Sequence, residues 1–373
     1  MNEPRRVAVA MSGGVDSSVA AALLRERGHS VLGVTMRLWR EAPLPGERDE
    51  PSGVDDCVEQ AAAVCRRLGI PHHAVDLRDA FERVVVDYLV AEYARGRTPN
   101  PCLQCNRAFK FGALLRHAHS LGASHLATGH YARVERRADA WRLLTAVDAR
   151  KDQSYVLYAL RQAELAALML PLGDLTKERV RGMARAMGLP AAERAESQDI
   201  CFLRDGNYRR FIAERAPGSV RPGPILHLDG RPLGEHRGLP FYTVGQREGL
   251  GIAAPHPLYV LRIDAARNAL IVGPAESLGR DALLAEAMSY VAGASPPEGT
   301  AVEAKIRYRA RRVAARIWPL SGERARVTLE RPLRDITPGQ AVVLYDGQEV
   351  LGGGIIVEAL QKSHDAQEGA LHA

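Results

Sequence analysis

The stretch of sequence that decides the fold runs from Arg6 to Ser18 and reads R-V-A-V-A-M-S-G-G-V-D-S-S. Its first part, Arg6 to Met11, is a short apolar run that predicts a buried strand. The small residues Ser12 to Gly14 predict a tight turn, and apolar residues then recur at helical spacing up to Gly28. Such a turn exposes backbone N–H groups at the start of a helix, so the stretch predicts an anion-binding loop in an α/β fold.

Two commoner phosphate-binding motifs are excluded at this loop. The general P-loop needs a Lys before Ser or Thr, and the dinucleotide fold needs G-x-G-x-x-G, and neither pattern occurs between Ser12 and Ser18. An ordinary tight turn with an Asp or Ser helix cap is the alternative that these residues leave open.

The alternation of strands and helices continues to about residue 205. Because parallel strands need helical crossovers between them, this order predicts a doubly wound parallel sheet. A loop rich in Pro, Gly and charged residues lies between Glu41 and Val54. Further strands are expected at residues 30–36, 71–76 and 125–129, and further helices at 58–68 and 79–93.

A different pattern begins after about residue 205. Gly and Pro are dense through residues 217–238, and a hairpin around Asn268 is expected from the runs at 258–263 and 269–273. The later apolar runs, at 302–307, 314–318, 324–329 and 341–345, predict a small antiparallel barrel. The chain is therefore divided into an α/β domain (1–205), a small, mostly β central domain (206–278), a carboxyl-terminal β-barrel (279–362) and a polar tail (363–373).

The overall composition is that of a folded globular protein, with 373 residues, 46% of them hydrophobic and 25% charged. No apolar run approaches the roughly 20 residues that span a bilayer, so we expect neither membrane insertion nor export. Five cysteines at irregular spacing do not make a disulfide scaffold. They favour a reducing cytosol and thiols with a metal-binding or catalytic role.

The positive charge is concentrated near the carboxyl end. Residues 302–331 contain nine basic and three acidic side chains, which accounts for the whole net charge of +6. Four of the basic residues alternate, so on a strand they would share one face that could follow a phosphate backbone, with Tyr308 on the opposite face. A solvated strand face is the alternative. The four are Lys305, Arg307, Arg309 and Arg311.

The cysteines fall into two kinds of context. Cys65 lies on the apolar face of a helical pattern, so we expect it to be buried. In T-P-N-P-C-L-Q-C-N, residues 98–106, two prolines predict an extended loop that holds Cys102 and Cys105 at a helix start, where a thiol pKa is lowered. Cys201 follows nearly a hundred residues later. A pair of distant thiols suits sulfur transfer, because one carries a persulfide and the other attacks its inner sulfur.

The loop S-G-G-x-D-S resembles the pyrophosphatase loop of the N-type ATP pyrophosphatase superfamily, whose members adenylate a carbonyl oxygen and release pyrophosphate. The resemblance implies that ATP binds here and that Asp16 is placed for Mg²⁺, which prefers carboxylate and phosphate oxygens. Met36 would lie near the adenine, with a plain core position equally open, and Gly129 would let the nucleotide approach the backbone. The implied nucleotide-binding residues are Ala10, Met11, Ser12, Gly13, Gly14, Val15, Asp16, Ser17, Met36 and Gly129.

Five further motifs are similar to those of the bacterial tRNA-specific 2-thiouridylases, and the resemblance covers about residues 6–360. They are T-P-N-P-x-x-x-C-N, H-Y-A-R, K-D-Q-S-Y, S-Q-D-I-C-F and F-Y-T-V-G-Q-R-x-G-L-G-I. The resemblance implies a cytosolic enzyme that activates C2–O2 of the wobble uridine as an adenylate. Sulfur then replaces the oxygen, giving 2-thiouridine, AMP and pyrophosphate.

The roles of single residues are carried over from the same family. Cys201 matches the cysteine that receives the persulfide, and Cys105 matches the one that completes the disulfide. The target uridine must leave its stack to enter a pocket, which a single-stranded loop makes inexpensive. That pocket would be formed by Asn100, Pro101 and Cys102, and the other tRNA-contacting positions are His130, Lys151, Asp152, Gln153, Arg307, Tyr308 and Gln340.

Cys102 departs from the pattern of some members, which have an Asp there that is proposed as a general acid/base. A thiol could substitute for it, and we expect the persulfide route. Alternatively, Cys102, Cys105 and Cys201 would be three ligands of a [4Fe-4S] cluster with one open iron site for exogenous sulfide. Zinc is a weaker third option, because no fourth ligand is evident.

The family resemblance also implies partners: the tRNAs for Lys, Glu and Gln, and a persulfide donor that is either a sulfur relay protein or a cysteine desulfurase. Two other functions stay open. A ligase of the same superfamily that acts on a small molecule would explain the phosphate loop but not the paired cysteines. The other is a tRNA-binding or chaperone-like protein whose catalysis is lost.

Overall fold

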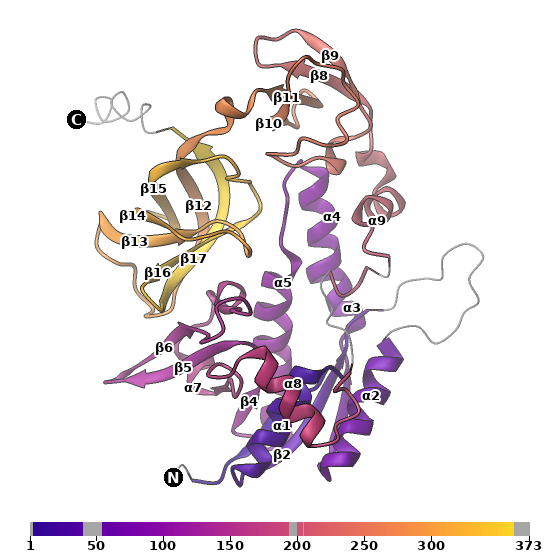
Figure 1. The fold of residues 1–373 in the computed structure, drawn as a ribbon, viewed down its shortest axis with the longest axis vertical. Helices are drawn as coiled ribbons and strands as arrows, with labels where there is room; N and C mark the ends of the chain where they lie inside the picture. Colours follow the sequence, from indigo (N-terminus) through magenta and orange to yellow (C-terminus); the bar gives the residue numbers. More distant parts are fainter. Residues whose placement is uncertain (1–2, 40–53, 194–199, 204, 362–373) are drawn as a thin grey trace.

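The computed structural model describes residues 3–39, 54–193, 200–203 and 205–361. Three β-sheets organise these residues, and Figure 1 shows the α/β unit at the bottom, the barrel at the left and a smaller sheet at the top. Nearly all of the predicted loop at 41–54, residues 197–199 of the second cysteine motif, and the polar tail from 363 lie outside the described residues.

The first sheet is parallel and has the strand order β3-β2-β1-β4-β7. Along β1, Val7 and Val9 pack into one hydrophobic cluster, while Ala8 between them packs into another. Both faces of the sheet are therefore covered, which confirms the predicted doubly wound fold. The strands are β1 (Arg6–Ala10), β2 (Ser30–Arg37), β3 (His72–Asp76), β4 (His125–Ala127) and β7 (Leu168–Met169).

Helices cover the two faces in separate groups. The cluster of Val7 and Val9 contains side chains of α1, α2 and α8, and the cluster of Ala8 contains side chains of α5, η2 and α6. No helix among the described residues is long and apolar enough to cross a membrane. The helices of this unit are α1 (Val15–Glu26), α2 (Val54–Leu68), α3 (Arg78–Phe81), η1 (Glu82–Val86), α4 (Asp87–Ala94), α5 (Pro101–Gln104), η2 (Cys105–Leu114), α6 (Leu115–Ser120), η3 (Ser154–Leu157), α7 (Gln162–Ala166) and α8 (Lys177–Ala186).

The small central sheet is mixed, with the order β10-β11-β8-β9. The predicted hairpin is present, because β10 and β11 pair antiparallel and Asn268 at their turn has a φ of 47°. The strand β11 pairs parallel with β8. The elements are α9 (Tyr208–Arg215), η4 (Pro217–Ser219), β8 (Gly223–His227), β9 (Pro232–His236), η5 (Leu239–Phe241), β10 (Tyr259–Asp264), β11 (Ala269–Gly273) and η6 (Ala275–Leu278).

The third sheet contains the predicted antiparallel barrel. Six strands run in the order β12-β15-β14-β13-β16-β17, and pairing of β12 with β17 closes them into a barrel that has no free edge within it. Their inner side chains form a core of their own. The strands are β12 (Arg280–Tyr290), β13 (Thr300–Lys305), β14 (Val313–Leu320), β15 (Arg324–Leu333), β16 (Ala341–Asp346) and β17 (Glu349–Leu360).

A hairpin of the α/β unit extends the barrel sheet, and the sequence patterns did not predict it. Strands β5 (Ala132–Arg137) and β6 (Ala140–Thr145) pair with each other, and β6 also pairs with β17. Arg142 donates to Glu349 at 2.9 Å across this junction. The barrel is therefore joined to the α/β unit by strand pairing as well as by side chains.

The predicted alternating row of basic residues is wrong. Strand β13 ends at Lys305, and a turn closed by the Ala310 N–H on the Arg307 carbonyl (3.1 Å) follows, so the row does not lie on one strand face. The Lys305 ammonium lies 5.8 Å from the ring centre of Tyr308, so these two side chains point the same way, not to opposite faces. An alternation of residue types along the sequence does not show where a strand ends and a turn begins.

Loops of all three units meet at Thr98, in the segment that leads to the cysteines. The barrel contacts it through the Pro338 carbonyl, which accepts from the Thr98 N–H at 2.9 Å, and through the Gln340 side chain, which donates to the Thr98 carbonyl at 2.8 Å. The central unit contacts it through the hydroxyl of Thr243, 2.7 Å from that of Thr98. The loop is thus clamped by both other units.

Gly339 is the residue that makes this clamp possible. Its φ is +93°, and a Cβ there would lie 2.9 Å from the Thr98 nitrogen and 3.0 Å from the Thr98 carbonyl carbon. Gly322 has a similar φ of +69° but nothing within 4 Å. We therefore expect Gly339→Ala to lower the free energy of unfolding by about 1–3 kcal/mol more than Gly322→Ala, because only the first adds a clash to the backbone strain.

Urea titration of the two variants measures this difference. Equal losses of stability would contradict the close approach of the barrel to the Thr98 backbone. The Gly322→Ala variant is the matched control, since both glycines lie in barrel loops.

Candidate active site

The loop between β1 and α1 has the geometry of an anion site. Gly14 is the N-cap of α1 and provides no side-chain cap, so the first N–H groups of the helix are not capped by a side chain. The hydroxyls of the loop turn inward instead: Ser18 donates to the Gly14 carbonyl at 2.8 Å, and Ser17 accepts from the Ser12 N–H at 3.2 Å. This favours the anion-binding interpretation over an ordinary capped turn.

Glycine is required inside this loop. Gly13 has a φ of +72°, and a Cβ on it would lie 2.8 Å from Cβ of Gln60 on α2. The side chains of Met11 and Val15 are buried in the core, so only their backbones are available to a ligand. The predicted loop is therefore a backbone cradle.

Asp16 is held by two partners that the sequence analysis missed. The Lys177 ammonium donates to both oxygens of the Asp16 carboxylate at 2.7 Å, and the Tyr131 hydroxyl donates to one of them at 2.7 Å. Lys177 is the first residue of α8 and is 8% exposed. The sequence distinguishes Lys177 only by the rarity of lysine, because the chain has five lysines among its 50 basic residues.

The segment Thr128–Tyr131, which follows β4, connects this loop to the cysteine region. A Cβ on Gly129 would lie 2.8 Å from both the carbonyl carbon of Asp16 and the nitrogen of Ser17. The next residue, His130, is bonded to Lys110 of η2, with 3.2 Å between its Nε2 and the ammonium. Gly129 thus allows the close approach of two backbone segments. This role is additional to the nucleotide contact predicted for it.

Met36 lies where β2 ends and is partly buried. It packs against two hydrophobic clusters, one of which contains Cys105. The end of the second strand therefore lies close to the cysteine helix. These contacts are those of a core residue, and contact with adenine stays a prediction.

The T-P-N-P loop begins the cysteine helix as its sequence predicted. Asn100 is the N-cap of α5, and its side-chain oxygen accepts from the Cys102 N–H at 3.1 Å, while Pro101 takes the first helical position. Cys102 is exposed, and Cys105, one turn on, is buried. Cys201 lies just after residues 194–199, which are outside the described residues, and it is exposed.

The predicted lowering of thiol pKa is wrong for these residues. Although Cys102 and Cys201 are exposed in part, the protein atoms around all three sulfur atoms desolvate their thiolates. This desolvation raises the pKa of Cys102 and Cys105 above the usual value, and Lys110 only partly opposes it. Desolvation, followed by the neighbouring thiols of Cys105 and Cys102, raises the pKa of Cys201 to about 12. The increase in thiol pKa caused by desolvation therefore outweighs the decrease expected from the helix N-terminus. The mutual influence of the three thiols also shows that the fold gathers them in one place.

All five cysteines are free thiols, so the structure contains no disulfide between Cys105 and Cys201. Cys65 is fully buried with a pKa raised by desolvation to about 11, as its place on an apolar helix face predicted. Within the described ranges, no group of three or more His, Cys, Asp or Glu side chains is placed to hold a metal ion. A [4Fe-4S] cluster binds each thiolate to a different iron atom, so this finding concerns a single bound ion and the cluster stays a prediction.

The K-D-Q segment lies beside the same region. Asp152 is buried and accepts from the N–H groups of Ala146 and Ser154 at 3.0 and 3.2 Å. Gln153 exchanges two hydrogen bonds with the backbone of Tyr131, at 2.9 and 2.8 Å. Of the three predicted tRNA contacts here, these two side chains support the local structure.

His130, another predicted tRNA contact, is buried, with its Nδ1 2.7 Å from the Thr128 hydroxyl. Burial and the nearby Lys110 charge hold its pKa well below the usual range, so it is neutral. Both ring nitrogens therefore have partners within the protein.

The barrel supplies the remaining predicted contacts. Arg307 donates to the Asp335 carbonyl at 3.2 and 3.0 Å and to the Thr337 hydroxyl at 3.2 Å, so it supports the loop that leads to Gln340. Tyr308 is partly buried and packs edge-on against Tyr155 at 6.0 Å. Burial raises the pKa of Tyr308, and a smaller contribution comes from Cys102, which places this barrel residue near the thiols.

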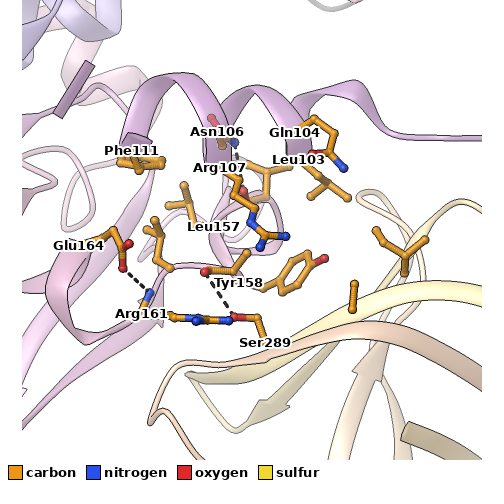
Figure 2. Close-up of a pocket in the computed structure, with 15 residues that line it drawn as sticks. Leu103, Gln104, Asn106, Arg107, Phe111, Leu157, Tyr158, Arg161, Glu164 and Ser289 are labelled. Atoms are coloured by element: carbon orange, nitrogen blue, oxygen red, sulfur yellow. Dashed lines mark hydrogen bonds between the residues drawn. The ribbon is translucent and has the colours of Figure 1, made fainter. Parts of the chain in front are cut away.

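A pocket of about 200 Å³ lies between the cysteine helix and the barrel, and Figure 2 shows its walls. The helix contributes Asn106 and Arg107, and the barrel contributes Ser289, which donates to the Ala159 carbonyl at 3.4 Å. None of the predicted site residues lines this pocket. It marks the interface between the two units and not the place where the loop, the thiols and Tyr308 converge.

A parallel sheet with an uncapped S-G-G-x-D-S loop, next to a group of thiols, defines an ATP-using enzyme of the pyrophosphatase-loop class. Three family models match consecutive parts of the chain: "tRNA methyl transferase HUP domain" at residues 5–205, "tRNA methyl transferase PRC-barrel domain" at 209–274, and "Aminomethyltransferase beta-barrel domain" at 280–356.

Curated relatives match almost end to end. The chain is 50% identical over 372 residues to the tRNA-specific 2-thiouridylase MnmA of Roseiflexus castenholzii, covering 94% of this chain and 99% of that protein. It is 51% identical over 360 residues to the enzyme of the same name from Moorella thermoacetica, covering 95% and 99%. The chain belongs to the family of tRNA-specific 2-thiouridylases.

Solved structures are more distant. A 4-thiouridine synthetase–RNA complex with bound ATP is 16% identical with a TM-score of 0.34, covering 57% of this chain and 50% of that one. NMN synthetase from Francisella tularensis is 16% identical with a TM-score of 0.32, covering 52% and 67%. The family assignment depends on the sequence relatives.

The raised pKa of Cys201 predicts how its reactivity depends on pH. Only the thiolate is alkylated, so with a folded pKa of about 12 the rate should rise about tenfold per pH unit from pH 7 to 9 without a plateau. Iodoacetamide labelling, followed by peptide mass spectrometry to separate Cys201 from Cys102, measures this rate. In urea the labelling rate of the same thiol should level off near its usual pKa, and a plateau below pH 9 in the folded enzyme would contradict the raised pKa.

Proposed function

We propose that this chain is an ATP-dependent tRNA-uridine 2-sulfurtransferase that forms 2-thiouridine at the wobble position, with AMP and pyrophosphate as the other products. The observation that carries the proposal is the segment Thr128–Tyr131. Through Gly129 and Tyr131 it contacts the phosphate loop, and through His130 it contacts Lys110 beside the thiols. The adenylating and the sulfur-carrying parts are thereby held next to each other.

The first step activates the uridine with ATP. The phosphate loop at residues 10–17 binds the triphosphate through its backbone N–H groups, and O2 of the uridine attacks the α-phosphorus while pyrophosphate leaves. Gly129 lies beside the loop, and Met36 is proposed at the adenine. The Lys177 ammonium, held on Asp16, is positioned to neutralise charge at this loop.

Mg²⁺ fits one remaining position on Asp16. A carboxylate has about four lone-pair sites, and the bonds from Lys177 and Tyr131 use three of them. One carboxylate oxygen together with phosphate oxygens and water is a typical Mg²⁺ environment. When bound, the ion supplies charge neutralisation to the phosphates.

The second step transfers sulfur. Cys201 carries a persulfide, and the Cys105 thiolate attacks its inner sulfur, which forms the Cys105–Cys201 disulfide and releases hydrosulfide. Hydrosulfide attacks C2 of the adenylated uridine, and AMP leaves. The sulfane sulfur gains the two electrons that the two thiols lose, so an external dithiol must reduce the disulfide before the next turnover. Cys102 is proposed at the uridine, where other members have Asp.

The tRNA is proposed to lie between the α/β unit and the barrel. Its flipped uridine would enter beside Asn100, Pro101 and Cys102, the loop that the barrel and the central unit clamp at Thr98. The other proposed contacts are His130, Lys151, Asp152, Gln153, Arg307, Tyr308 and Gln340. The proposed units are 1–205 for catalysis, 206–278 as adapter and 279–362 for tRNA binding.

Partners and compartment follow from the same chemistry. A persulfide donor protein, either a sulfur relay protein or a cysteine desulfurase, must reload Cys201 after each turnover. The substrates are the tRNAs for Lys, Glu and Gln, and we propose a cytosolic enzyme, where thiols stay reduced.

The central prediction concerns Cys201. We expect Cys201→Ser to abolish 2-thiouridine formation while pyrophosphate release from ATP remains dependent on added tRNA, because the serine leaves the phosphate loop and the tRNA contacts intact. Nucleoside analysis and a pyrophosphate assay measure the two steps separately.

The control is Cys65→Ala, which removes a thiol from the core and not from the gathered group. Normal thiolation by the Cys201→Ser variant would refute the assignment. Pyrophosphate release that ignores tRNA would indicate a small-molecule ligase, and no release with any tRNA would indicate a binding protein.

Anaerobic purification tests the iron–sulfur version of the same reaction. We expect metal-free enzyme to be fully active with a persulfide donor, because exchange between a persulfide and a thiol needs no metal. Iron and sulfide analysis together with the thiolation rate is the measurement. An intact [4Fe-4S] cluster that is required for activity would replace the persulfide route.

A further inference from the structure

The cysteine helix contains an unusual turn. Helix η2 (Cys105–Leu114) is π-helical over ten residues. In an α-helix, residues five apart point about 140° away from each other. Hydrogen bonding from i to i+5 widens the turn, so residues five apart come to lie on nearly the same side. The π-helical turn therefore places Lys110 on the side of the helix that carries Cys105.

Lys110 is fixed at its tip by His130. The two nitrogens are 3.2 Å apart, and His130 is itself held by Thr128 at 2.7 Å. Because His130 is neutral, it accepts a hydrogen bond from the Lys110 ammonium and does not repel its positive charge. A lysine ammonium has three N–H donors, and this contact uses one of them.

The charge of Lys110 acts on the whole group of thiols. Burial raises the pKa of Cys102, Cys105 and Cys201, and in each case Lys110 opposes that effect. Among the residues that the structure describes, the other titratable groups that act on the thiols are the thiols themselves and the Tyr308 phenol from the barrel. Lys110 is thus a cation that acts on all three thiols.

We propose that Lys110 is a positioning residue for sulfur transfer: its ammonium, set beside Cys105 by the π-helical turn and fixed by His130, stabilises the anionic sulfur that forms during the reaction. This inference rests on the proposed function. Sulfur transfer creates negative charge twice, on the attacking Cys105 thiolate and on the hydrosulfide that leaves Cys201. In a site where burial disfavours anions, a fixed positive charge lowers the energy of both.

Adenylation does not use this charge, because the phosphate loop has its own lysine. Lys177 is bonded to Asp16, whereas Lys110 is bonded to His130 on the other side of the Thr128–Tyr131 segment. Loss of Lys110 should therefore slow the second step and spare the first. A residue that only stabilised the fold would affect both.

The test compares Lys110→Gln, Lys110→Met and Lys110→Arg. Enzyme preloaded with persulfide is mixed with tRNA and ATP in a single turnover, and both 2-thiouridine and pyrophosphate are measured. We expect both neutral variants to form 2-thiouridine about tenfold more slowly, which corresponds to about 1.4 kcal/mol of lost transition-state stabilisation. Lys110→Arg should stay within about twofold of the original enzyme, and pyrophosphate release should be unchanged in all three.

A second readout and a control make the test specific. Iodoacetamide labelling of Cys201 at one pH should be slower in Lys110→Gln and restored in Lys110→Arg. Arg116→Gln removes a charge from the exposed end of the same helical segment and should change neither readout.

Three outcomes overturn the inference: unchanged sulfur transfer in the neutral variants, no rescue by Lys110→Arg, or loss of pyrophosphate release along with transfer. Failure of the proposed function looks different, because the original enzyme itself would then release no pyrophosphate with tRNA.

Discussion

The arrangement of the site depends on one close approach between two backbone segments. Gly129 lies against the first turn of α1 so tightly that a Cβ would be 2.8 Å from the backbone of Asp16 and Ser17. Because that distance is fixed, the residue after it reaches Lys110 and the next one reaches Asp16. A single packing constraint, which only glycine satisfies, thereby sets the relative position of the phosphate loop and the thiols.

A second constraint makes the three units act as one. The loop before Cys102 is kept extended by Pro99 and Pro101, so it cannot satisfy its own backbone groups by forming a helix. Its partners come from the barrel and from the central unit, which meet at Thr98. The proposed uridine pocket is therefore complete only when all three units are in place. The proposed tRNA binding and the proposed sulfur transfer thus depend on the same contacts.

Features encoded by a short segment of the chain were predicted correctly from the sequence. Features that depend on contacts with distant segments were not. Hydrophobic periodicity and turn residues predicted the parallel sheet, the Asn268 hairpin and the barrel, because strand and helix periods are properties of a short segment. The alternating row from Lys305 was wrong because the strand turns after it. The lowered thiol pKa was wrong because desolvation depends on the units that cover the sulfur atoms, which a helix start does not reveal.

The sequence by itself determined the doubly wound fold, the phosphate loop and, through its motifs, the family. Each of these is encoded by residues that are adjacent in the chain. Only the tertiary structure decided that Lys177 and Tyr131 hold Asp16, that His130 holds Lys110, and that β5 and β6 extend the barrel. These depend on contacts between residues up to 207 positions apart and on a π-helical turn that shifts the spacing along a helix, and neither leaves a local pattern.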